Sequence, residues 1–598
     1  MNQIIVSVVV GTILFLTIAG VGVLPGTVTV AALVLAFGAM LAGCRTPATG
    51  RMDREAPARP WLEGLFVLIL VLLLASVLPL PPALAALLGQ PRAAQQAAAG
   101  AALREASQLQ MIPALSVDPW FAFTCSRAGT LRMIMLVAAV FGTILLISAL
   151  TPAWKARYLR LVLFLGAAVA VGGYLSHWHY PEGNRLWWLF PVPPTRPGPV
   201  GGFINRNDFG GFLVLFCPAA LALAFEDFAE RRWFYGTVSA ILLLILVFGI
   251  VGSLSRTSFV ACVAALAGAT GFCLLRLRRS RWSALLLGTA LVLFISLLLS
   301  VPTIRTRLAG ILAPTQTASV QTRLAEWREC LRAWSAYPIL GVGANAVGAV
   351  YPQFRRTTSG GTLVFAENEY VQLLVEGGAA GVLLTAALIV VAWRRSRCNA
   401  ATEPRSPVLT IAAGGALLGA AIQSLAGVPL RIPVYAIVMA SLVGLLLRPV
   451  PLRWPLLGRL SPRLSLALPA AVALLAALLA APAAFSMHRL DSHAYLQGAD
   501  SGTLAQAIVW SPTSWQAWYY LGRHACARAG AGDAPTYRFG ERCIARACAY
   551  DPNNYRLWYQ LGFVRQRRND AEGAQRAFVR AHELRSWLPV PPPEKERR

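Results

Sequence analysis

Long apolar runs separated by short polar connections form the dominant pattern of the chain. A helix needs roughly 20 apolar residues to cross the hydrocarbon layer of a bilayer, which is about 30 Å thick. About thirteen runs approach that length. They lie near residues 3–23, 27–44, 61–80, 131–151, 160–175, 210–225, 235–252, 258–275, 282–301, 370–393, 407–426, 433–447 and 465–485. This pattern predicts an all-α fold, a polytopic integral membrane protein with about thirteen transmembrane helices.

Basic residues fall in every second connection between these runs. The clusters are Arg45, Arg51, Arg54 and Arg59; Lys155, Arg157 and Arg160; Arg231 and Arg232; Arg276, Arg278, Arg279 and Arg281; Arg394, Arg395 and Arg397; and Arg448, Arg453, Arg459 and Arg463. All of them then lie on one side of the membrane, which the positive-inside rule makes cytoplasmic. We therefore expect a multi-pass protein of the bacterial inner (cytoplasmic) membrane with a cytoplasmic N-terminus and an extracytoplasmic C-terminal domain.

Composition and charge agree with this assignment. The 598 residues are 57% hydrophobic and 13% charged, with a mean hydropathy of +0.58, values typical of a membrane protein rather than a soluble globular domain. The net charge of +27 does not indicate a nucleic-acid partner, because much of the excess sits in short connections that fix topology. The ten cysteines show no metal-ligand spacing, so we expect no metal site.

The sequence beyond Ser486 has the mixed composition of a soluble domain. Two copies of one pattern, roughly 40 residues apart, match tetratricopeptide positions. The matching residues are Trp518, Leu521 and Gly522 in one copy and Trp558, Leu561, Gly562, Ala574, Phe578 and Ala581 in the next. We predict an α-helical tetratricopeptide-like domain over 487–586, with a worn earlier copy near 491–510, and a disordered tail over 587–598.

Residues 301–369 form the longest hydrophilic segment between two apolar runs. Against Glu326 and Glu329 this segment carries the arginines Arg305, Arg307, Arg323, Arg328, Arg332, Arg355 and Arg356. Guanidinium groups present forked donors that stay charged, so the segment suits a phosphate or pyrophosphate ligand. An amphipathic helix is predicted from Arg323 through Trp327 to about Tyr337, followed by a turn that contains Gly341 and Gly343.

Two more polar motifs lie at span entrances on the predicted outer face. Asn205, Arg206 and Asn207 open the sixth span, where a helix N-terminus helps to bind an anion. The alternative interpretation is a helix cap made by Asn207 or Asp208. Arg256 lies between the seventh and eighth spans, where it meets a phospholipid head group, a partner or a substrate.

The order of these pieces resembles the O-antigen ligase and polymerase superfamily over roughly residues 200–450. The resemblance includes Glu367-Asn368, the later Gly378-Ala379-Ala380-Gly381, and the segment from Gln423 to Arg431. The tetratricopeptide-like domain resembles the protein O-oligosaccharyltransferase branch. The resemblance implies a GT-C-like transmembrane domain over 1–486, with its core at 200–450. It also implies a glycosyltransferase that moves or polymerises a glycan from a polyprenyl-pyrophosphate donor onto an acceptor hydroxyl at the extracytoplasmic face, without a cofactor.

The resemblance also implies roles for individual residues. Glu367 and Asn368 are the expected catalytic pair, and Arg206, Arg256 and Arg323 the expected pyrophosphate ligands. The supporting motif residues are Asn205, Asn207, Trp327, Gly341, Gly343, Glu369, Gly378, Gly381 and Arg431. The chain departs from the family pattern at two positions, because Glu367 replaces an expected histidine and Gly427 an expected ionisable residue.

The sequence leaves open how glutamate at position 367, in place of the expected histidine, affects the activity. Apolar surroundings would raise the pKa of its carboxyl and make it a better base, whereas neighbouring arginines would lower that pKa. Glu367 then acts as a base, positions the acceptor, or marks a changed activity.

Two other classes of function fit the same pattern of spans. A transporter or flippase of lipid-linked glycans is one, although few ionisable residues lie near the centres of the predicted spans. A non-catalytic envelope scaffold is the other. The acceptor is left open as a lipid, a protein or a growing glycan, and an envelope protein is a further candidate partner through the repeats.

Overall fold

The fold is known from a computed structural model and is almost entirely helical. The part of the chain that it describes comprises residues 1–18, 27–45, 61–80, 90–113, 121–182, 185–187, 190–191, 201–276, 302, 318–356, 363–402, 406–448, 462–487, 496–529 and 533–591. Only two short antiparallel strand pairs occur in these ranges, β1 (Pro79–Leu80) with β2 (Phe121–Ala122) and β3 (Arg185–Leu186) with β4 (Phe190–Pro191). The predicted all-α class is confirmed.

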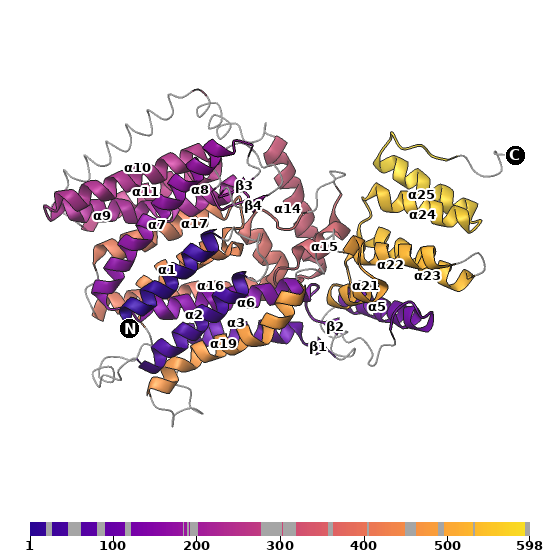
Figure 1. The fold of residues 1–598 in the computed structure, drawn as a ribbon, viewed down its shortest axis with the longest axis horizontal. Helices are drawn as coiled ribbons and strands as arrows, with labels where there is room; N and C mark the ends of the chain where they lie inside the picture. Colours follow the sequence, from indigo (N-terminus) through magenta and orange to yellow (C-terminus); the bar gives the residue numbers. More distant parts are fainter. Residues whose placement is uncertain are drawn as a thin grey trace.

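Apolar helices form one large bundle (Figure 1). They are α1 (Asn2–Ile18), α2 (Thr27–Arg45), α3 (Trp61–Val77), α6 (Arg127–Ser148), α7 (Pro152–His179), α8 (Arg206–Val214), α9 (Cys217–Ala229), α10 (Trp233–Gly252), α11 (Arg256–Arg276), α16 (Glu369–Thr402), α17 (Pro407–Gln423), α18 (Pro433–Leu445) and α19 (Pro462–Met487). In the described ranges, 6 helical segments are long and apolar enough to cross a bilayer, and further apolar helices are shorter. Every predicted run falls on these helices except 282–301, which lies outside the described residues.

Small residues let the helices of the bundle approach closely. A Cβ atom at Gly142 of α6 would come within 2.9 Å of the Leu35 backbone in α2, and one at Gly415 of α17 within 2.6 Å of Pro218 in α9. Backbones that approach this closely gain van der Waals contact, which drives helix association where water is absent.

The predicted sixth span is two helical pieces. The chain bends after α8 at Leu215 and Phe216 and resumes as α9, because Pro218 has no backbone N–H to continue the ladder. The combined segment Arg206–Ala229 is almost wholly buried inside the bundle. Its central place fixes the N-terminus of α8 among α10, α11 and α17.

Several of the basic connections share one end of the bundle. The Lys155 ammonium donates to the carbonyl of Leu447 at 2.7 Å. The buried guanidinium of Arg395 pairs with Glu63 at 2.6 Å and donates to the carbonyl of Arg448. The structure therefore gathers connections that the charge pattern assigned to one side. That this side is cytoplasmic stays a prediction.

A small lobe lies between the bundle and the C-terminal helices (Figure 1). It contains α14 (Ala318–Ala336) and α15 (Val347–Phe354), packed around Cys330, Tyr337 and Val350. α14 confirms the amphipathic helix predicted in the central polar segment. Arg305 and Arg307 of that segment lie outside the described residues.

The C-terminal region is α-helical in its described residues, as the sequence predicted. They are α21 (Ser501–Trp510), α22 (Trp515–Arg528), α23 (Ala534–Tyr550), α24 (Tyr555–Arg567) and α25 (Ala571–Leu584). Gly522 lets α22 approach the Gly540 carbonyl of α23, and Gly562 faces the ring of Phe578. The tetratricopeptide assignment, the domain boundaries and the disordered tail stay predictions.

A distant segment joins these helices. α5 (Gln90–Gln108) precedes α6 in the chain, yet Leu103 and Ala106 share a core with α22 and α23. Arg546 of α23 donates to the carbonyl of Ala98 at 3.0 Å. The predicted early copy near 491–510 includes α21 in its described residues, and α5 adds a helix that the repeat pattern did not show.

The C-terminal helices are docked on the small lobe. Arg355, directly after α15, pairs with Asp551 at 2.8 Å, and both side chains are buried. Thr513 donates to the carbonyl of Ala349 at 2.9 Å, and Ser511 to that of Cys125 at 3.3 Å. These contacts hold the lobe and the C-terminal helices together.

Candidate functional site

A cation and a carboxylate from different elements meet at the polar end of the bundle. The guanidinium of Arg323 on α14 lies 3.6 Å from the carboxylate of Glu367, with the two side chains 27% and 33% exposed. Arg323 also donates to the carbonyl of Ala426, beyond α17, at 3.1 Å. The pair is therefore fixed from three directions and still open to solvent, as a binding site requires.

The backbone at Glu367 is turned so that its side chain faces Arg323. Glu367 has a positive φ of 50°, a left-handed conformation that is uncommon outside glycine. Asn368 follows as a cap of α16, since its Oδ1 accepts from the amides of Tyr370 and Val371 at 3.0 and 3.1 Å. Its Nδ2 donates to the carbonyl of Leu425 at 3.0 Å. Asn368, expected to be catalytic, has its polar atoms engaged in holding the turn.

A buried charge network supports the turn that carries Glu367. Arg431 binds Glu369 at 3.0 Å and Glu376 at 2.7 Å. Glu376 accepts from Gln372 at 2.5 Å, and Gln372 accepts from the amide of Ala366 at 2.7 Å. One cation thus serves two carboxylates, an arrangement in which loss of one partner leaves buried charge unpaired. Glu369 and Arg431, expected as motif residues, position the segment that carries Glu367.

Hydrogen bonds from two side chains in the middle of α14 hold this helix in place. The indole of Trp327 donates to the carbonyl of Ala366 at 2.8 Å, which ties α14 to the residue before Glu367. Farther along, Glu329 accepts from the hydroxyl of Tyr351 at 2.5 Å and from the amide of Arg356 at 2.8 Å. Trp327 therefore keeps Arg323 and Glu367 in register.

At the glycine motif, the turn at Gly341 packs directly against the backbone of α16 around Gly378. Gly341 and Gly378 have φ of 63° and 60°, which favours glycine at both positions. The amide of Gly343 donates to the carbonyl of Glu376 at 3.0 Å, and a Cβ at Gly341 would lie 2.3 Å from the Glu376 backbone. Gly381 differs, because a Cβ added there meets nothing within 4 Å. The motif kinks α16 beneath the turn of Glu367.

Two helix N-termini adjoin one another on the bundle side. Asn205 caps α8 by accepting from the amide of Asn207 at 2.9 Å. The carbonyl of Asn207 accepts from Ser258 of α11 at 3.2 Å, which joins the two helix starts. Arg206 and Arg256 are the first residues of α8 and α11, so the structure brings these expected pyrophosphate ligands to adjoining helix entrances, where anions are favoured.

Asp208 lies within electrostatic range of the Arg323–Glu367 pair. It is the third residue of α8, and the charged groups that act on it are those of Glu367 and Arg323. The sequence pattern allows Asn207 or Asp208 as the helix cap, whereas in the structure Asn205 caps α8. Nothing in the linear pattern showed that the start of α8 borders a glutamate far along the chain.

Burial and the neighbouring Arg323 act in opposite directions on the pKa of the Glu367 carboxyl. Desolvation by its surroundings raises the pKa of Glu367, and the neighbouring Arg323 lowers it only in part. Glu326 on α14 likewise has a raised pKa, chiefly through burial and then through the charge of Glu367. A carboxyl with a raised pKa is a stronger base once ionised, so Glu367 can take a proton from a hydroxyl. Among the residues described, no group of three or more His, Cys, Asp or Glu side chains is placed to hold a metal ion.

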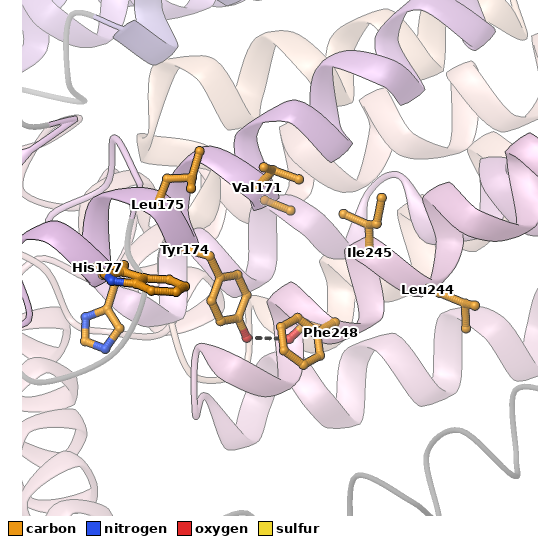
Figure 2. Close-up of a pocket in the computed structure, with 9 residues that line it drawn as sticks. Val171, Tyr174, Leu175, His177, Leu244, Ile245 and Phe248 are labelled. Carbon is orange, nitrogen blue, oxygen red and sulfur yellow. Dashed lines mark hydrogen bonds between the residues drawn. The ribbon is translucent and has the colours of Figure 1, made fainter.

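An apolar groove of about 790 Å³ runs between α7 and α10 (Figure 2). Its lining is Ala170, Val171, Tyr174, Leu175, His177, Trp178, Leu244, Ile245 and Phe248. Tyr174 stacks on Phe248 with ring centroids 4.7 Å apart and donates to its carbonyl at 3.0 Å. Tyr174 also touches Gly252, the last residue of α10 before the turn to Arg256. Apart from Tyr174 and His177, the lining is apolar, so the groove suits a hydrocarbon chain.

Comparison with known proteins identifies one region of the chain. The family model described as O-Antigen ligase matches residues 240–386, from α10 into α16. A search of curated proteins gave no match. The matched range includes Arg256, Arg323 and Glu367, whereas Arg206 and Arg431 lie outside it. The match is shorter than the 200–450 region of the expected resemblance.

Proposed function

Because the chain carries an O-antigen ligase family domain at residues 240–386, we propose that it is a glycosyltransferase of the O-antigen ligase and polymerase type. It moves a glycan from a polyprenyl-pyrophosphate donor onto an acceptor hydroxyl at the extracytoplasmic face. The observation that carries this proposal is the solvent-accessible Arg323–Glu367 pair, 3.6 Å apart at the polar end of an apolar helix bundle. A cation for a leaving phosphate and a base for a hydroxyl are the two groups that glycan transfer needs.

The proposed step forms one bond and breaks one bond. The acceptor oxygen attacks the anomeric carbon of the donor sugar, and the bond from that carbon to the phosphate oxygen breaks. Negative charge grows on the departing pyrophosphate, where Arg323 and the entrances of α8 and α11, with Arg206 and Arg256, stabilise it. Glu367 takes the proton of the acceptor hydroxyl. The products are the extended acceptor and the polyprenyl pyrophosphate.

The apolar groove between α7 and α10 supports a lipid-linked donor. Its apolar wall lies in the helix bundle, and its lining includes Tyr174, which lies against Gly252, close along the chain to Arg256. A lipid chain in the groove would place its head group toward the helix entrances. The acceptor is a lipid, a protein or a glycan, and the C-terminal helices docked on the lobe are the surface proposed for an envelope protein.

Reconstitution tests this function. The full-length protein in lipid vesicles is given a polyprenyl-pyrophosphate oligosaccharide and a hydroxylated acceptor, and the transferred glycan is separated and weighed by mass spectrometry. We expect transfer by the wild type, a severe loss in Arg323→Ala and little change in Arg328→Ala, whose side chain is exposed on the same helix. Movement of the intact donor across the vesicle membrane without transfer would support the transporter alternative instead.

A further inference from the structure

The short turn after α14 exposes two large apolar side chains on a fixed backbone. Ile339 and Leu340 are 68% and 39% exposed. The carbonyl of Pro338 accepts from the amide of Ala379 in α16 at 2.9 Å, and the carbonyl of Ile339 accepts from the amide of Ala380 at 3.0 Å. The turn is therefore tied to α16 by its backbone, and its apolar side chains point away from the protein.

Hydrogen bonds place this turn at the same height in the bundle as the ends of two other helices. The carbonyl of Ser76 in the last turn of α3 accepts from the amide of Thr124 at 3.0 Å. The amide of Cys125, shortly before α6, donates to the carbonyl of Val342 at 2.9 Å, and the amide of Val342 donates to the carbonyl of Val375 in α16 at 2.9 Å. The end of α3, the start of α6 and the exposed turn are thus joined at one height.

The surface of α16 changes character at this height. Before Gly378, the side chains of Gln372 and Glu376 are buried. The helix is kinked at Gly378, and beyond it Leu383 is 70% exposed and Ile389 is exposed as well. This segment is among those long and apolar enough to cross a bilayer, and a large exposed apolar surface marks contact with lipid or protein. The lipid-facing side of α16 therefore begins just past Gly378, where the turn packs.

The last turns of α14 extend this exposed surface and add a cation. Leu331, Arg332 and Ser335 are exposed there, and Leu78, directly after α3, is exposed at the same height. Apolar side chains beside an exposed arginine are typical of protein surfaces that lie in the head-group layer of a membrane. Leucine and isoleucine enter the acyl boundary, and a guanidinium binds lipid phosphates.

We propose that the last turns of α14 and the turn of Ile339 and Leu340 form a contact with the surface of the lipid bilayer, in which Arg332 binds lipid phosphates. This lipid contact is continuous with the lipid-facing side of α16, which favours lipid over a second protein. Arg323 lies on the same helix, about 14 Å before Arg332 at 1.5 Å per residue. The lipid contact therefore sets the distance of the Arg323–Glu367 pair from the lipid phosphates.

The inference does not depend on the proposed function, because it requires only that the bundle crosses a bilayer. An exposed turn in water would meet no lipid. An interface with a second copy of the chain would bury the same side chains against protein. These three arrangements differ in what lies within reach of Ile339 and Leu340.

The first test labels the native protein from the lipid. The full-length protein is placed in phospholipid vesicles that contain a phosphatidylcholine with a diazirine near its ester carbonyls, and the adducts are mapped by mass spectrometry after illumination. We expect adducts on Ile339 and Leu340, as on Leu383 of α16. The exposed Phe563 and Trp587 of the C-terminal region are the controls and should stay unlabelled. Absence of adducts from Ile339 and Leu340, or labelling no greater than that of Phe563 and Trp587, overturns the inference.

The second test examines the cation. Labelling of the Ile339 and Leu340 peptide is compared between an anionic and a zwitterionic photoactivatable phospholipid in the wild type, in Arg332→Ala and in Arg567→Ala, whose side chain is exposed in α24. A basic residue near an anionic lipid surface contributes about 1 kcal/mol, which corresponds to roughly fivefold in binding. We therefore expect Arg332→Ala to reduce the preference for anionic lipid about fivefold and Arg567→Ala to leave it unchanged.

Two results would count against the lipid contact in this second test. An unaltered lipid preference in Arg332→Ala would show that the guanidinium binds no lipid phosphate. Cross-links between two copies of the chain at Ile339, formed by a bifunctional reagent in place of lipid adducts, would assign the surface to a protein interface. Thermal unfolding of both variants in the same vesicles verifies that each is folded as the wild type is.

Discussion

The carboxylate of Glu367 lies 3.6 Å from the guanidinium of Arg323, although the two residues belong to separate elements of the structure. The contact depends on the left-handed turn at Glu367 and on the bond from Trp327 to Ala366, which aligns α14 with the start of α16. It brings the base and the phosphate-binding cation of the proposed reaction into one solvent-accessible place.

Removal of the Arg323 guanidinium should reduce transfer far more than it reduces folding. We expect Arg323→Ala to lower kcat by a factor of about 10² to 10³, the effect of deleting one preorganised donor to a developing negative charge. Because Arg323 is 27% exposed, the unfolding temperature should change little. We would measure the turnover and thermal unfolding of Arg323→Ala and Arg328→Ala. Equal turnover in the two variants would contradict the role assigned to Arg323.

The activity should depend on pH through Glu367. Burial raises the pKa of its carboxyl, and the base form exists only above that pKa. We therefore expect transfer to fall on acidification at a pH above the ordinary titration range of glutamate. Arg323 lowers this pKa in part, so residual activity in Arg323→Gln should fall at a still higher pH. The measurement is the pH profile of kcat/KM, and an acid limb unmoved by Arg323→Gln would remove Glu367 as the titrating base.

The glycine motif offers a matched pair of substitutions. Gly341→Ala forces a Cβ to within 2.3 Å of the Glu376 backbone at a φ of 63°, so we expect destabilisation of about 2 kcal/mol or more. Gly381→Ala adds a Cβ in open space within α16 and should be neutral or stabilising by about 0.5–1 kcal/mol. Thermal unfolding in detergent measures both, and similar values for the two variants would disprove the argument that the two backbones pack directly.

The network of Arg431 should be sensitive to loss of its cation. Arg431→Met leaves Glu369 and Glu376 buried without their partner, an effect of about 3–5 kcal/mol for a broken buried pair. The combined variant Arg431→Met with Glu376→Gln should recover part of that stability, because it removes one of the stranded charges. Chemical unfolding of the two variants tests this, and an additive loss in the combined variant is the contrary result.

The docking of the C-terminal helices should depend on one ion pair. Asp551→Ala removes the carboxylate that pairs with the buried Arg355 guanidinium, and we expect the C-terminal helices to become sensitive to protease while the bundle stays intact. Arg356→Ala, whose side chain is exposed, is the control. Limited proteolysis followed by mass mapping reports the outcome, and equal resistance in both variants would show that other contacts hold the interface.

The order of amino acids was enough to predict the membrane helices and the turn motif. Each predicted apolar run that lies in the described ranges falls on a helix or, for the sixth run, on the two pieces α8 and α9, because the length of an apolar run alone decides whether it can span a bilayer. Gly341 and Gly343 were likewise readable as a turn, since positive φ is a property of single residues. The family match over 240–386 agrees with the motif order seen in the chain.

Tertiary packing alone decided the chemistry of the site. Whether burial or Arg323 governs the pKa of Glu367 depends on how much water the folded surroundings exclude, which no local pattern contains. The helix α5 likewise joins the C-terminal helices from a distant part of the chain. Such contacts arise from the arrangement of whole helices, so hydropathy and spacing specify the helices and leave their neighbours undetermined.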